Sequence, residues 1–461
     1  MSSAAQGPAQ CSVRVGSVIF RLSLTEHPVL SVTSQERWTK AKLSPRLRGK
    51  KQKLQLTLPM FDLSRIPSVF FEDPFPFYAE LLSGPPVLEQ EDGSVLISRH
   101  ALLGAVYKDL DGYSSDKKLS FGPKFGVTSP LFEHHTNSLV FNDPPLHTRV
   151  RKIMTGALNP RAIQVMEPGL RDTISRLLDD MAETNSKKGG IDIIEDFASQ
   201  IPIQIIGDLL GIPFEERTPL RDWSLAILGA LEPVVSDRQM RIGNEAVDDF
   251  KAYLETLVAR RRQEGRDPET DVLTRLILAK DAEELSDTEL LHNCIFILNA
   301  GHETTTNLIG NALYMLWCYP DQKRLLINDL KLIDGAVEEV LRTQSPNQFG
   351  NRQTTREIEL GGVKLDKNVN IHMCIGAANR DPDVFDHPDV FDICRKNARH
   401  HLGFAAGPHV CVGLTLARLE AKIAVSEFLK RFAEYEIAPN AVISNRIRFR
   451  GYVALPAALS D

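Results

Sequence analysis

The sequence predicts a mainly α-helical fold with small β-sheets, and three observations support this fold class. Apolar residues recur at helical spacing over seven long stretches, whereas only two short regions have the pattern of strands. From Met60 onward no Gly/Ser-rich linker or internal repeat interrupts the chain, so residues 60–461 are expected to form a single domain. The helical stretches are residues 146–158, 161–184, 194–210, 241–264, 287–318, 322–343 and 413–432.

Residues 1–59, ahead of this domain, differ from it in charge. They hold ten Lys or Arg and two acidic residues, a net charge of +8, whereas the whole chain carries −6. A basic, Ser-rich segment is compatible with an organellar targeting peptide or a nucleic-acid-binding tail. We prefer to interpret residues 1–59 as a disordered or mis-assigned extension, because nothing in them carries chemistry. No nucleic-acid partner is expected.

The composition of the chain is that of a soluble globular protein. Of its 461 residues, 43% are hydrophobic and 25% are charged. The six cysteines show no paired spacing, which favours a reducing compartment, without disulfides, and a cytoplasmic location. The apolar runs are shorter than the ~18–20 residues of a spanning helix, so no membrane span is expected.

The two strand regions and the irregular segments can be placed along the chain. Residues 87–97 have the pattern of a β-hairpin that turns at Asp92-Gly93. The second β region runs over residues 354–371, with Gly361-Gly362 as its turn. Residues 111–138 and the segment around residues 215–240 lack clear periodicity, and they are predicted to be mobile loops.

The helix after Ser286 is the most clearly marked. Ser286 and Glu289 form a capping box at its start, and Pro320 ends it after Cys318. A helix of this length spans ~48 Å, enough to cross a domain. Its middle contains Ala300-Gly-His-Glu-Thr-Thr305. Gly and consecutive Thr residues lower helix stability, so this stretch is either a close helix–helix contact or a functional site.

The loop from Gly403 to Gly413 carries the strongest chemical signal. Phe404, Gly407, His409, Cys411 and Gly413 fit the pattern F-x-x-G-x-H-x-C-x-G. A thiolate ligand donates electron density to haem iron, and it needs backbone N–H groups directed at its sulfur. The helix that starts near residue 414 adds the positive end of its dipole. A single cysteine is more often structural, but five residues at fixed offsets favour a ligand.

The sequence fits two other cofactor classes poorly. His400, His401, His409 and Cys411 suggest zinc, but a structural zinc site needs paired ligand spacing such as C-x2-C, and the second pair is missing. A dehydrogenase would need G-x-G-x-x-G after a strand, and the sequence contains none.

Together with an E-x-x-R pair at residues 339–342 and the segment 378–392, these motifs occur in the order typical of the cytochrome P-450 superfamily. Over roughly residues 60–461 the chain resembles that family, most of all its soluble bacterial branch. The resemblance implies a single P-450-type haem domain with a long central distal helix, and haem b as the cofactor. It assigns roles to the residues of the loop and of other segments. Cys411 is then the axial iron ligand. The other residues that bind the cofactor are Phe404, Gly413, His147, Arg151, Arg352 and His409. The last four of these contact the haem propionates.

The resemblance also assigns the catalytic residues. Small Ala300 and Gly301 leave room for dioxygen above the iron, the Thr304 hydroxyl takes part in oxygen activation, and Glu303 helps to relay protons. Glu339 and Arg342 form a buried ion pair that holds the cysteine loop. Two departures from the family pattern stand out. Val390 occupies a position that is often Arg, which puts a third arm of the ion network in doubt, and Ala405 replaces a common Gly.

The implied reaction inserts one oxygen atom of dioxygen into a C–H bond or an alkene of a lipophilic small molecule. Electrons then come from NAD(P)H through a separate ferredoxin and ferredoxin reductase, because no electron-transfer module is fused to this chain, which is expected to be a monomer. By analogy the substrate pocket contains Phe296, Asn299, Gln348 and Phe349. Two alternatives remain, a haem-thiolate protein that binds a ligand or senses a gas without turnover, and a peroxygenase driven by peroxide. The Glu303-Thr304 pair argues against both.

Overall fold

The computed structural model describes residues 10–15, 18–23, 31–32, 61–269 and 271–460, in two compact units, Met1–Pro59 and Met60–Asp461. In the first unit the strands β1 (Gln10–Val15), β2 (Val18–Ser23) and β3 (Ser31–Val32) form an antiparallel sheet in the order β1-β2-β3. The remainder of residues 1–59 lies outside the described residues. The interpretation of this segment as an extension outside the haem domain stays a prediction.

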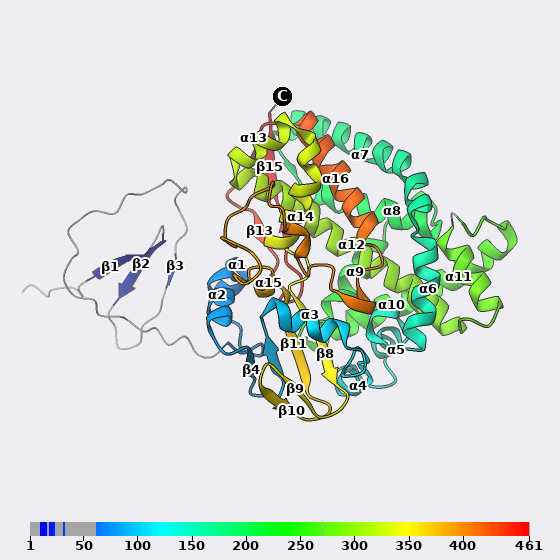
Figure 1. The fold of residues 1–461 in the computed structure, drawn as a ribbon. Helices are drawn as coiled ribbons and strands as arrows, with labels where there is room; N and C mark the ends of the chain where they lie inside the picture. Colours follow the sequence, from blue (N-terminus) through cyan, green and yellow to red (C-terminus); the bar gives the residue numbers. More distant parts are fainter. Residues whose placement is uncertain (1–9, 16–17, 24–30, 33–60, 270, 461) are drawn as a thin grey trace, which may run out of the picture. The chain divides into compact units, whose positions relative to one another are not determined.

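The second unit is mainly α-helical, which confirms the fold class (Figure 1). Its α-helices are α1 (Ser68–Glu72), α2 (Phe75–Ser83), α3 (His100–Lys108), α4 (Lys118–Phe125), α5 (Pro130–Asn137), α6 (Leu146–Ala157), α7 (Pro160–Lys188), α8 (Gln200–Leu210), α9 (Leu220–Gly229), α10 (Asp237–Glu264), α11 (Val272–Asp281), α12 (Asp287–Cys318), α13 (Pro320–Asn328), α14 (Ile333–Thr343), α15 (Ile375–Ala378) and α16 (Leu414–Arg431).

Helix α12 is the predicted long helix, with the predicted ends. The Ser286 side chain accepts a hydrogen bond from Glu289 N at 3.0 Å, and the Glu289 carboxylate accepts one from Ser286 N at 2.8 Å. The helix crosses the middle of the domain, where α8, α9 and α16 pack against it (Figure 1). Residues from all four helices belong to one large hydrophobic core. The motif in the middle of α12 is therefore held rigidly inside the domain.

The main sheet has the strand order β4-β5-β11-β8-β6 and lies at one edge of the domain (Figure 1). Strands β4 (Val87–Glu89) and β5 (Val95–Ile97) form the predicted hairpin around Asp92-Gly93. Strands β9 (Ile358–Leu360) and β10 (Val363–Leu365) form the second predicted hairpin. Gly361 and Gly362 connect them with φ values of 57° and 83°, a conformation that glycine adopts without strain. The other strands of this unit are β6 (Tyr113–Ser114), β7 (Ile191–Asp192), β8 (Phe349–Thr354), β11 (Asn370–Cys374), β12 (Tyr435–Ile437), β13 (Val442–Ile443), β14 (Tyr452–Ala454) and β15 (Pro456–Leu459).

Two of the sequence-based expectations for secondary structure are wrong. The stretch 322–343, predicted as one helix, is divided into α13 and α14, because the side chain of Asp329 caps a separate 3-10 turn, Leu330–Leu332, between them. The predicted loops at residues 111–138 and 215–240 contain α4, α5 and α9. Ser129 and Pro130, which favoured a loop in the sequence, are the N-cap and the first residue of α5.

Candidate active site

The cysteine loop forms one wall of a cavity, into which Cys411 faces together with Phe404, His409 and Gly413. The backbone of the loop is tightly closed. Cys411 N donates to Phe404 O at 2.9 Å, and Val410 N donates to Gly407 O at 3.0 Å. Gly407 has a φ of 67°, and a Cβ atom there would collide with the main chain of Tyr107 on α3. The glycine of the motif is therefore required by both conformation and packing.

Ala405, the second departure from the family pattern, also has a left-handed backbone conformation, with a φ of 58°. Residues other than glycine enter this region at a steric cost of roughly 1–2 kcal/mol. Glycine is therefore common at this position because of the backbone geometry, and Ala405 carries a local strain that glycine would not have.

Burial and nearby positive groups act on Cys411 in opposite directions, and burial is the larger effect. Burial raises the pKa of the Cys411 thiol, whereas the Gly413 backbone N–H and the charges of Arg151 and Arg418 lower it. Gly413 is also the N-cap of α16, so the positive end of this helix dipole lies beside the sulfur. These groups favour the thiolate form that a metal ligand needs.

The motif of α12 lines the same cavity through Ala300, Gly301 and Thr304. The Thr304 hydroxyl donates to Ala300 O at 2.7 Å, which leaves the lone pairs of Oγ1 available as acceptors. A Cβ atom on Gly301 would lie 2.9 Å from Ile206 Cδ1 of α8. Gly301 therefore serves close helix packing as well as the cavity.

Glu303 points to a different environment from Thr304, because it does not belong to the lining of the cavity. It is 7% exposed, and its carboxylate pairs with Arg446, which also bonds Glu232 at 3.3 Å. Burial raises the pKa of Glu303, while the charge and hydrogen bond of Arg446 lower it. Sequence reasoning missed Arg446 and Glu232, because they lie 143 and 71 residues away in the chain and have no motif.

The four residues assigned to the haem propionates, His147, Arg151, Arg352 and His409, all line the cavity. The His147 and His409 rings stack with centroids 3.8 Å apart. His147 Nε2, His409 Nε2 and Arg352 Nε are buried without a hydrogen-bond partner. Burial, followed by the charge of Arg151, lowers the pKa of His147 to about 4. Unpaired N–H donors and two arginines around a thiol-lined cavity fit a cofactor with carboxylate groups.

Lys117 is a further cation of this cavity, and no sequence pattern indicated it. It is 2% exposed, its Nζ has no hydrogen-bond partner, and it lines the cavity. Burial, followed by the charges of Arg352 and Arg448, lowers its pKa to about 7. In the sequence, Lys117 lies in a polar segment without periodicity and beside a second lysine, so it resembles an ordinary exposed side chain.

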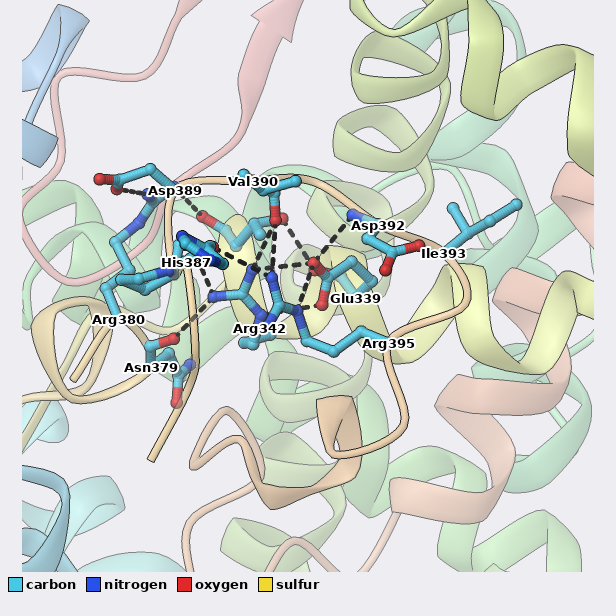
Figure 2. A network of polar contacts seen from close by, with 12 residues as sticks. Glu339, Arg342, Asn379, Arg380, His387, Asp389, Val390, Asp392, Ile393 and Arg395 are labelled. Carbon is cyan, nitrogen blue, oxygen red and sulfur yellow. Dashed lines mark hydrogen bonds and ion pairs between the residues drawn. The ribbon is translucent and has the colours of Figure 1, made fainter. Parts of the chain in front are cut away.

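Glu339 and Arg342 are fully buried on α14 and form a bidentate pair (Figure 2). Arg342 Nε and Nη2 each donate to the Glu339 carboxylate at 2.8 Å. The remaining donors of Arg342 are bound by main-chain oxygens of Asn379, Pro388 and Val390 at 3.1, 2.8 and 3.1 Å. Every guanidinium nitrogen of Arg342 is thus satisfied, as stability requires of a buried charge.

Val390 put a third arm of this network in doubt, but Arg395 provides one. Arg395, five residues further on, donates from Nε to Glu339 Oε1 at 3.1 Å (Figure 2). It also donates to the main-chain oxygens of Asp386, His387 and Val390. Because Val390 takes part through its carbonyl oxygen, its side chain is free to vary. The third arm of the ion network is therefore present, and it comes from residue 395 instead of residue 390.

A second ion network joins α14 to the cysteine loop. Glu338 accepts from Arg418 Nε at 2.6 Å and lies 3.0 Å from His401 Nε2. The Arg418 guanidinium lies over the Phe404 ring, 4.7 Å from its centroid. Despite burial, hydrogen bonds from His401 and Arg418 lower the pKa of Glu338 to about 2. The sequence pattern E-E-x-x-R contained Glu338, but only Glu339 has the family spacing, so Glu338 was missed.

Three of the four predicted pocket residues, Phe296, Asn299 and Phe349, line the cavity. The Asn299 side chain lies 3.3 Å from His134 Nε2, and its Oδ1 has no partner. The assignment of Gln348 to the pocket is wrong. Its side chain accepts from Tyr78 Oη at 2.6 Å and donates to Ser345 O at 2.6 Å, so it is bound inside the protein, away from the cavity.

Glu420 on α16 is another cavity residue, and it belongs to none of the sequence motifs. It is 4% exposed, its Oε2 has no partner, and burial raises its pKa to about 8. At neutral pH a carboxyl group with this pKa is mostly protonated and can donate a proton or a hydrogen bond. It is a carboxyl group of the cavity wall itself, unlike Glu303 and Glu232, which do not line the cavity.

A cysteine loop and an Ala-Gly-x-Glu-Thr helix that share one cavity define a haem-thiolate oxygenase. The family model "Cytochrome P450" matches residues 90–446, and the chain belongs to this family. Its members bind haem b through a cysteine thiolate and incorporate oxygen from dioxygen, so this protein is an oxidoreductase of that kind. Among the described helices, none is long and apolar enough to cross a membrane.

Relatives match over most of their length. The cytochrome P450 monooxygenase PikC of Streptomyces venezuelae is 32% identical over 427 residues, which cover 89% of this chain and 97% of PikC. The biotin biosynthesis cytochrome P450 of Bacillus subtilis (strain 168) is 32% identical over 381 residues, covering 80% of this chain and 92% of the relative. Vitamin D(3) 25-hydroxylase of Pseudonocardia autotrophica is 34% identical over 375 residues, covering 80% and 89%.

Solved structures show the same fold. The structure of P450BioI in complex with a hexadec-9Z-enoic acid-ligated acyl carrier protein has a TM-score of 0.79 and 30% identity, covering 85% of this chain and all of that chain. The structure of myxobacterial CYP267B1 in complex with myristic acid has a TM-score of 0.78 and 30% identity, covering 86% and 98%.

Proposed function

We propose that this protein is a monooxygenase that hydroxylates or epoxidises a lipophilic small molecule. The observation that carries the proposal is the cavity, because Cys411 and the Ala300, Gly301 and Thr304 face of α12 line it together. One molecule each of substrate, dioxygen and NAD(P)H, with one proton, gives oxygenated product, water and NAD(P)+. Haem with a thiolate ligand supplies the cleavage of the O–O bond.

The protein's part in the reaction is to bind, orient and deliver protons. Cys411 provides the ligand, and Arg151, Arg352, His147 and His409 are the residues that would hold the propionates of the haem. Ala300 and Gly301 leave the cavity open beside α12. Thr304 Oγ1, whose proton is bound by Ala300 O, accepts a hydrogen bond from water in the cavity and so orients a proton donor.

Two carboxyl groups support proton delivery to this point. Glu303 follows Gly301 and precedes Thr304 on α12, and its pKa is raised by burial. Glu420 lines the cavity and is mostly protonated at neutral pH, because burial raises its pKa to about 8. Arg446 restrains Glu303 through their ion pair, so Glu303 delivers protons only when this pair opens or when water reaches its free oxygen.

The apolar character of the cavity wall and the names of the relatives support a lipophilic substrate. Leu209, Leu228, Leu231, Ile297 and Leu308 line the cavity. The relatives include a 6-deoxyerythronolide B hydroxylase and a vitamin D(3) 25-hydroxylase, and a solved relative, CYP109E1, binds testosterone. These compounds differ widely, so for this chain they support the lipophilic class alone.

We propose that a ferredoxin delivers the electrons, reduced in turn by an NAD(P)H-dependent reductase, and that the protein acts as a cytoplasmic monomer. The support for a ferredoxin comes from the exposed basic side chain of Lys152 on α6, the helix that carries His147 and Arg151. Arg149 is less available to a partner, because it pairs with Glu289 at 2.6 Å. An acidic ferredoxin surface would be complementary to this end of α6.

The reduced protein treated with carbon monoxide tests the proposal. Cys411 as axial ligand gives the red-shifted Soret band of a thiolate, and Cys411→His should lose that band while the protein still binds haem. A normal thiolate spectrum in the Cys411→His variant would contradict the assignment.

Turnover separates the proposed enzyme from its alternatives. With surrogate ferredoxin and reductase, a monooxygenase consumes NAD(P)H and releases oxygenated product. Product formation with peroxide alone, and none with the electron-transfer proteins, would indicate a peroxygenase. No product under either condition with any compound that shifts the haem spectrum would indicate a binding or sensor protein.

A further inference from the structure

Arg448 lies between β13 and β14 and lines the cavity that contains Cys411 and Thr304. Its main-chain oxygen accepts a hydrogen bond from Gln348 N at 2.7 Å. Its guanidinium makes no hydrogen bond or ion pair with any residue in the described part of the chain. Arg448 is half-buried, and because arginine stays charged in proteins, its guanidinium favours an anionic partner. The cavity therefore contains a cation whose acceptor has to come from elsewhere.

The carboxylate that attracts Arg448 is Glu232, but its oxygens are already bound. Glu232 Oε1 accepts from Arg446 Nε at 3.3 Å, and Oε2 accepts from Ile447 N at 2.9 Å. The main-chain oxygen of Glu232 binds Lys124 Nζ at 2.6 Å. Since Arg446 also pairs with Glu303, both carboxylates of this region are occupied by an arginine other than Arg448.

Three further basic side chains lie near Arg448. The charge of Arg448 contributes to the lowered pKa of Lys117, Lys124 and His135. Lys117 and His135 line the cavity, and both Lys117 Nζ and His135 Nε2 are buried without a hydrogen-bond partner. The three side chains come from three segments: His135 from α5, Lys117 from the segment before α4, and Arg448 from the segment before β14. They lie close enough for the charge of Arg448 to lower the pKa of the other two.

This group is separate from the residues that would hold the propionates. The charges that act on His147 are those of Arg151, Asp143 and Arg352. In contrast, Arg448 acts on His135 and Lys124. Lys117 lies between the two groups, because Arg352 and Arg448 both act on it. The two carboxylates of haem therefore have Arg151 and Arg352, whereas Arg448 has a carboxylate nearby in Glu232 but no hydrogen-bonded anion.

We propose that Arg448 binds the carboxylate of a lipophilic substrate, with Lys117 and His135 as neighbouring donors. The inference rests on the proposed monooxygenase function and adds the substrate class, a long-chain or polycyclic carboxylic acid. A planar guanidinium matches a carboxylate with two parallel hydrogen bonds. The apolar part of the substrate then lies along the leucine and isoleucine side chains of α8, α9 and α12. The position of the bound carboxylate then determines which carbon atom of the substrate reaches the haem iron.

Spectral titration of the haem protein tests this site. The ligands are the n-alkanoic acids of ten to eighteen carbons, and the 1-alkanols and methyl esters of equal chain length serve as uncharged matches. In the wild-type protein the best acid should bind at least about tenfold more tightly than its alcohol, because charge-assisted hydrogen bonds are lost in the alcohol. Arg448→Gln should remove this preference with little change in alcohol affinity, and Arg448→Lys should retain part of it. Arg161→Gln, a loss of an exposed arginine on α7, is the matched control and should behave as wild type.

Haem content and the carbon monoxide spectrum, measured on each variant, distinguish failure of this inference from failure of the proposed function. A normal thiolate spectrum in Arg448→Gln with unchanged acid preference would overturn the inference and leave the proposed function intact. Loss of haem from Arg448→Gln would show that Arg448 serves the cofactor, which also overturns it. Equal binding of acid and alcohol by the wild-type protein, or no spectral change with any acid, would favour a neutral substrate bound at His134 and Asn299.

Discussion

The two sides of the cysteine loop differ in how completely the protein satisfies its own polar groups. Beneath the loop, Glu339 and Arg342 are buried and Arg395 is half-buried, and the three bind one another and main-chain oxygens. In the cavity, Lys117 Nζ and Arg352 Nε are among the buried nitrogen atoms without a partner. Unpaired buried groups are rare in folded proteins. The polar groups beneath the loop therefore find all their partners within the protein, whereas those of the cavity find theirs in the molecules that the cavity binds.

The difference explains why mutations in the two regions should have different consequences. A change beneath the loop removes one member of a closed network and leaves its partner charge buried, so folding and haem retention suffer together. A change in the cavity removes a group that no other side chain needs as a partner, so the fold tolerates it and an interaction with a bound molecule is lost instead. The following predictions test this division.

The largest expected effect is that of Glu339→Ala. Loss of this carboxylate leaves Arg342 and Arg395 without their common acceptor, and breaking a buried pair costs ~3–5 kcal/mol. This is a large share of a typical domain stability of ~5–15 kcal/mol. The variant should be produced with little haem per chain or should aggregate. The haem-to-protein ratio and the melting temperature measure the effect.

Asp334→Ala is the matched control on the same helix. It also removes a carboxylate from an ion pair, with Lys422 at 2.8 Å, but the Asp334 side chain is 56% exposed. Exposed pairs contribute ~0–1 kcal/mol, so haem content should stay normal. Wild-type haem content and melting temperature in Glu339→Ala would show that the network beneath the loop is not needed to hold it.

Thr304→Ala should have a smaller effect, confined to the cavity. The loss of one hydroxyl removes a hydrogen bond worth ~1–3 kcal/mol when a charged species is involved, and the fold does not depend on it. NAD(P)H should still be consumed, but oxygen should appear mainly as peroxide or water. The yield of product per NAD(P)H, together with the amount of peroxide, measures this uncoupling.

Thr306→Ala provides the comparison within α12. Thr306 Oγ1 donates to His302 O at 2.9 Å, much as Thr304 bonds Ala300, but Thr306 is absent from the cavity wall. Its loss should leave the product yield unchanged. If both variants couple as well as the wild type does, Thr304 has no part in proton delivery.

The comparison of the two regions also shows which features of the structure could be predicted from the sequence. The helix ends of α12 and the turn at Gly361-Gly362 follow from local capping and backbone preferences, so they were predicted correctly. Arg395 and Arg446 could not be predicted, because long-range packing brings them to Glu339 and Glu303 from elsewhere in the chain. Gln348 was misplaced because Tyr78, 270 residues away, and the main chain of Ser345 bind its side chain, and no spacing in the sequence indicates these contacts.

The motif residues were easiest to identify because their spacing reflects the chemistry common to the family. The residues that select the substrate carry no such spacing. Lys117, His135 and Arg448 come from three separate segments, and each resembles an ordinary surface residue in the sequence. That the three line one cavity without a hydrogen-bonded side-chain partner appears only in three dimensions, which is why the reaction class could be predicted and the substrate could not.

The smallest expected effect concerns Ala405, at the edge of both regions. Its φ of 58° is strained for alanine, so Ala405→Gly relieves a cost of roughly 1–2 kcal/mol, offset by a loss of ~0.4–1 kcal/mol because glycine makes the unfolded chain more flexible. The variant should melt slightly higher, with an unchanged thiolate spectrum. Ala406→Gly is the control, because Ala406 has an extended backbone with a φ of −148°. There the same substitution brings only the entropic loss, and the protein should melt lower. The contrast between two adjacent alanines isolates the backbone strain from any general effect of glycine in the loop, and a lower melting temperature for both variants would show that Ala405 is not strained.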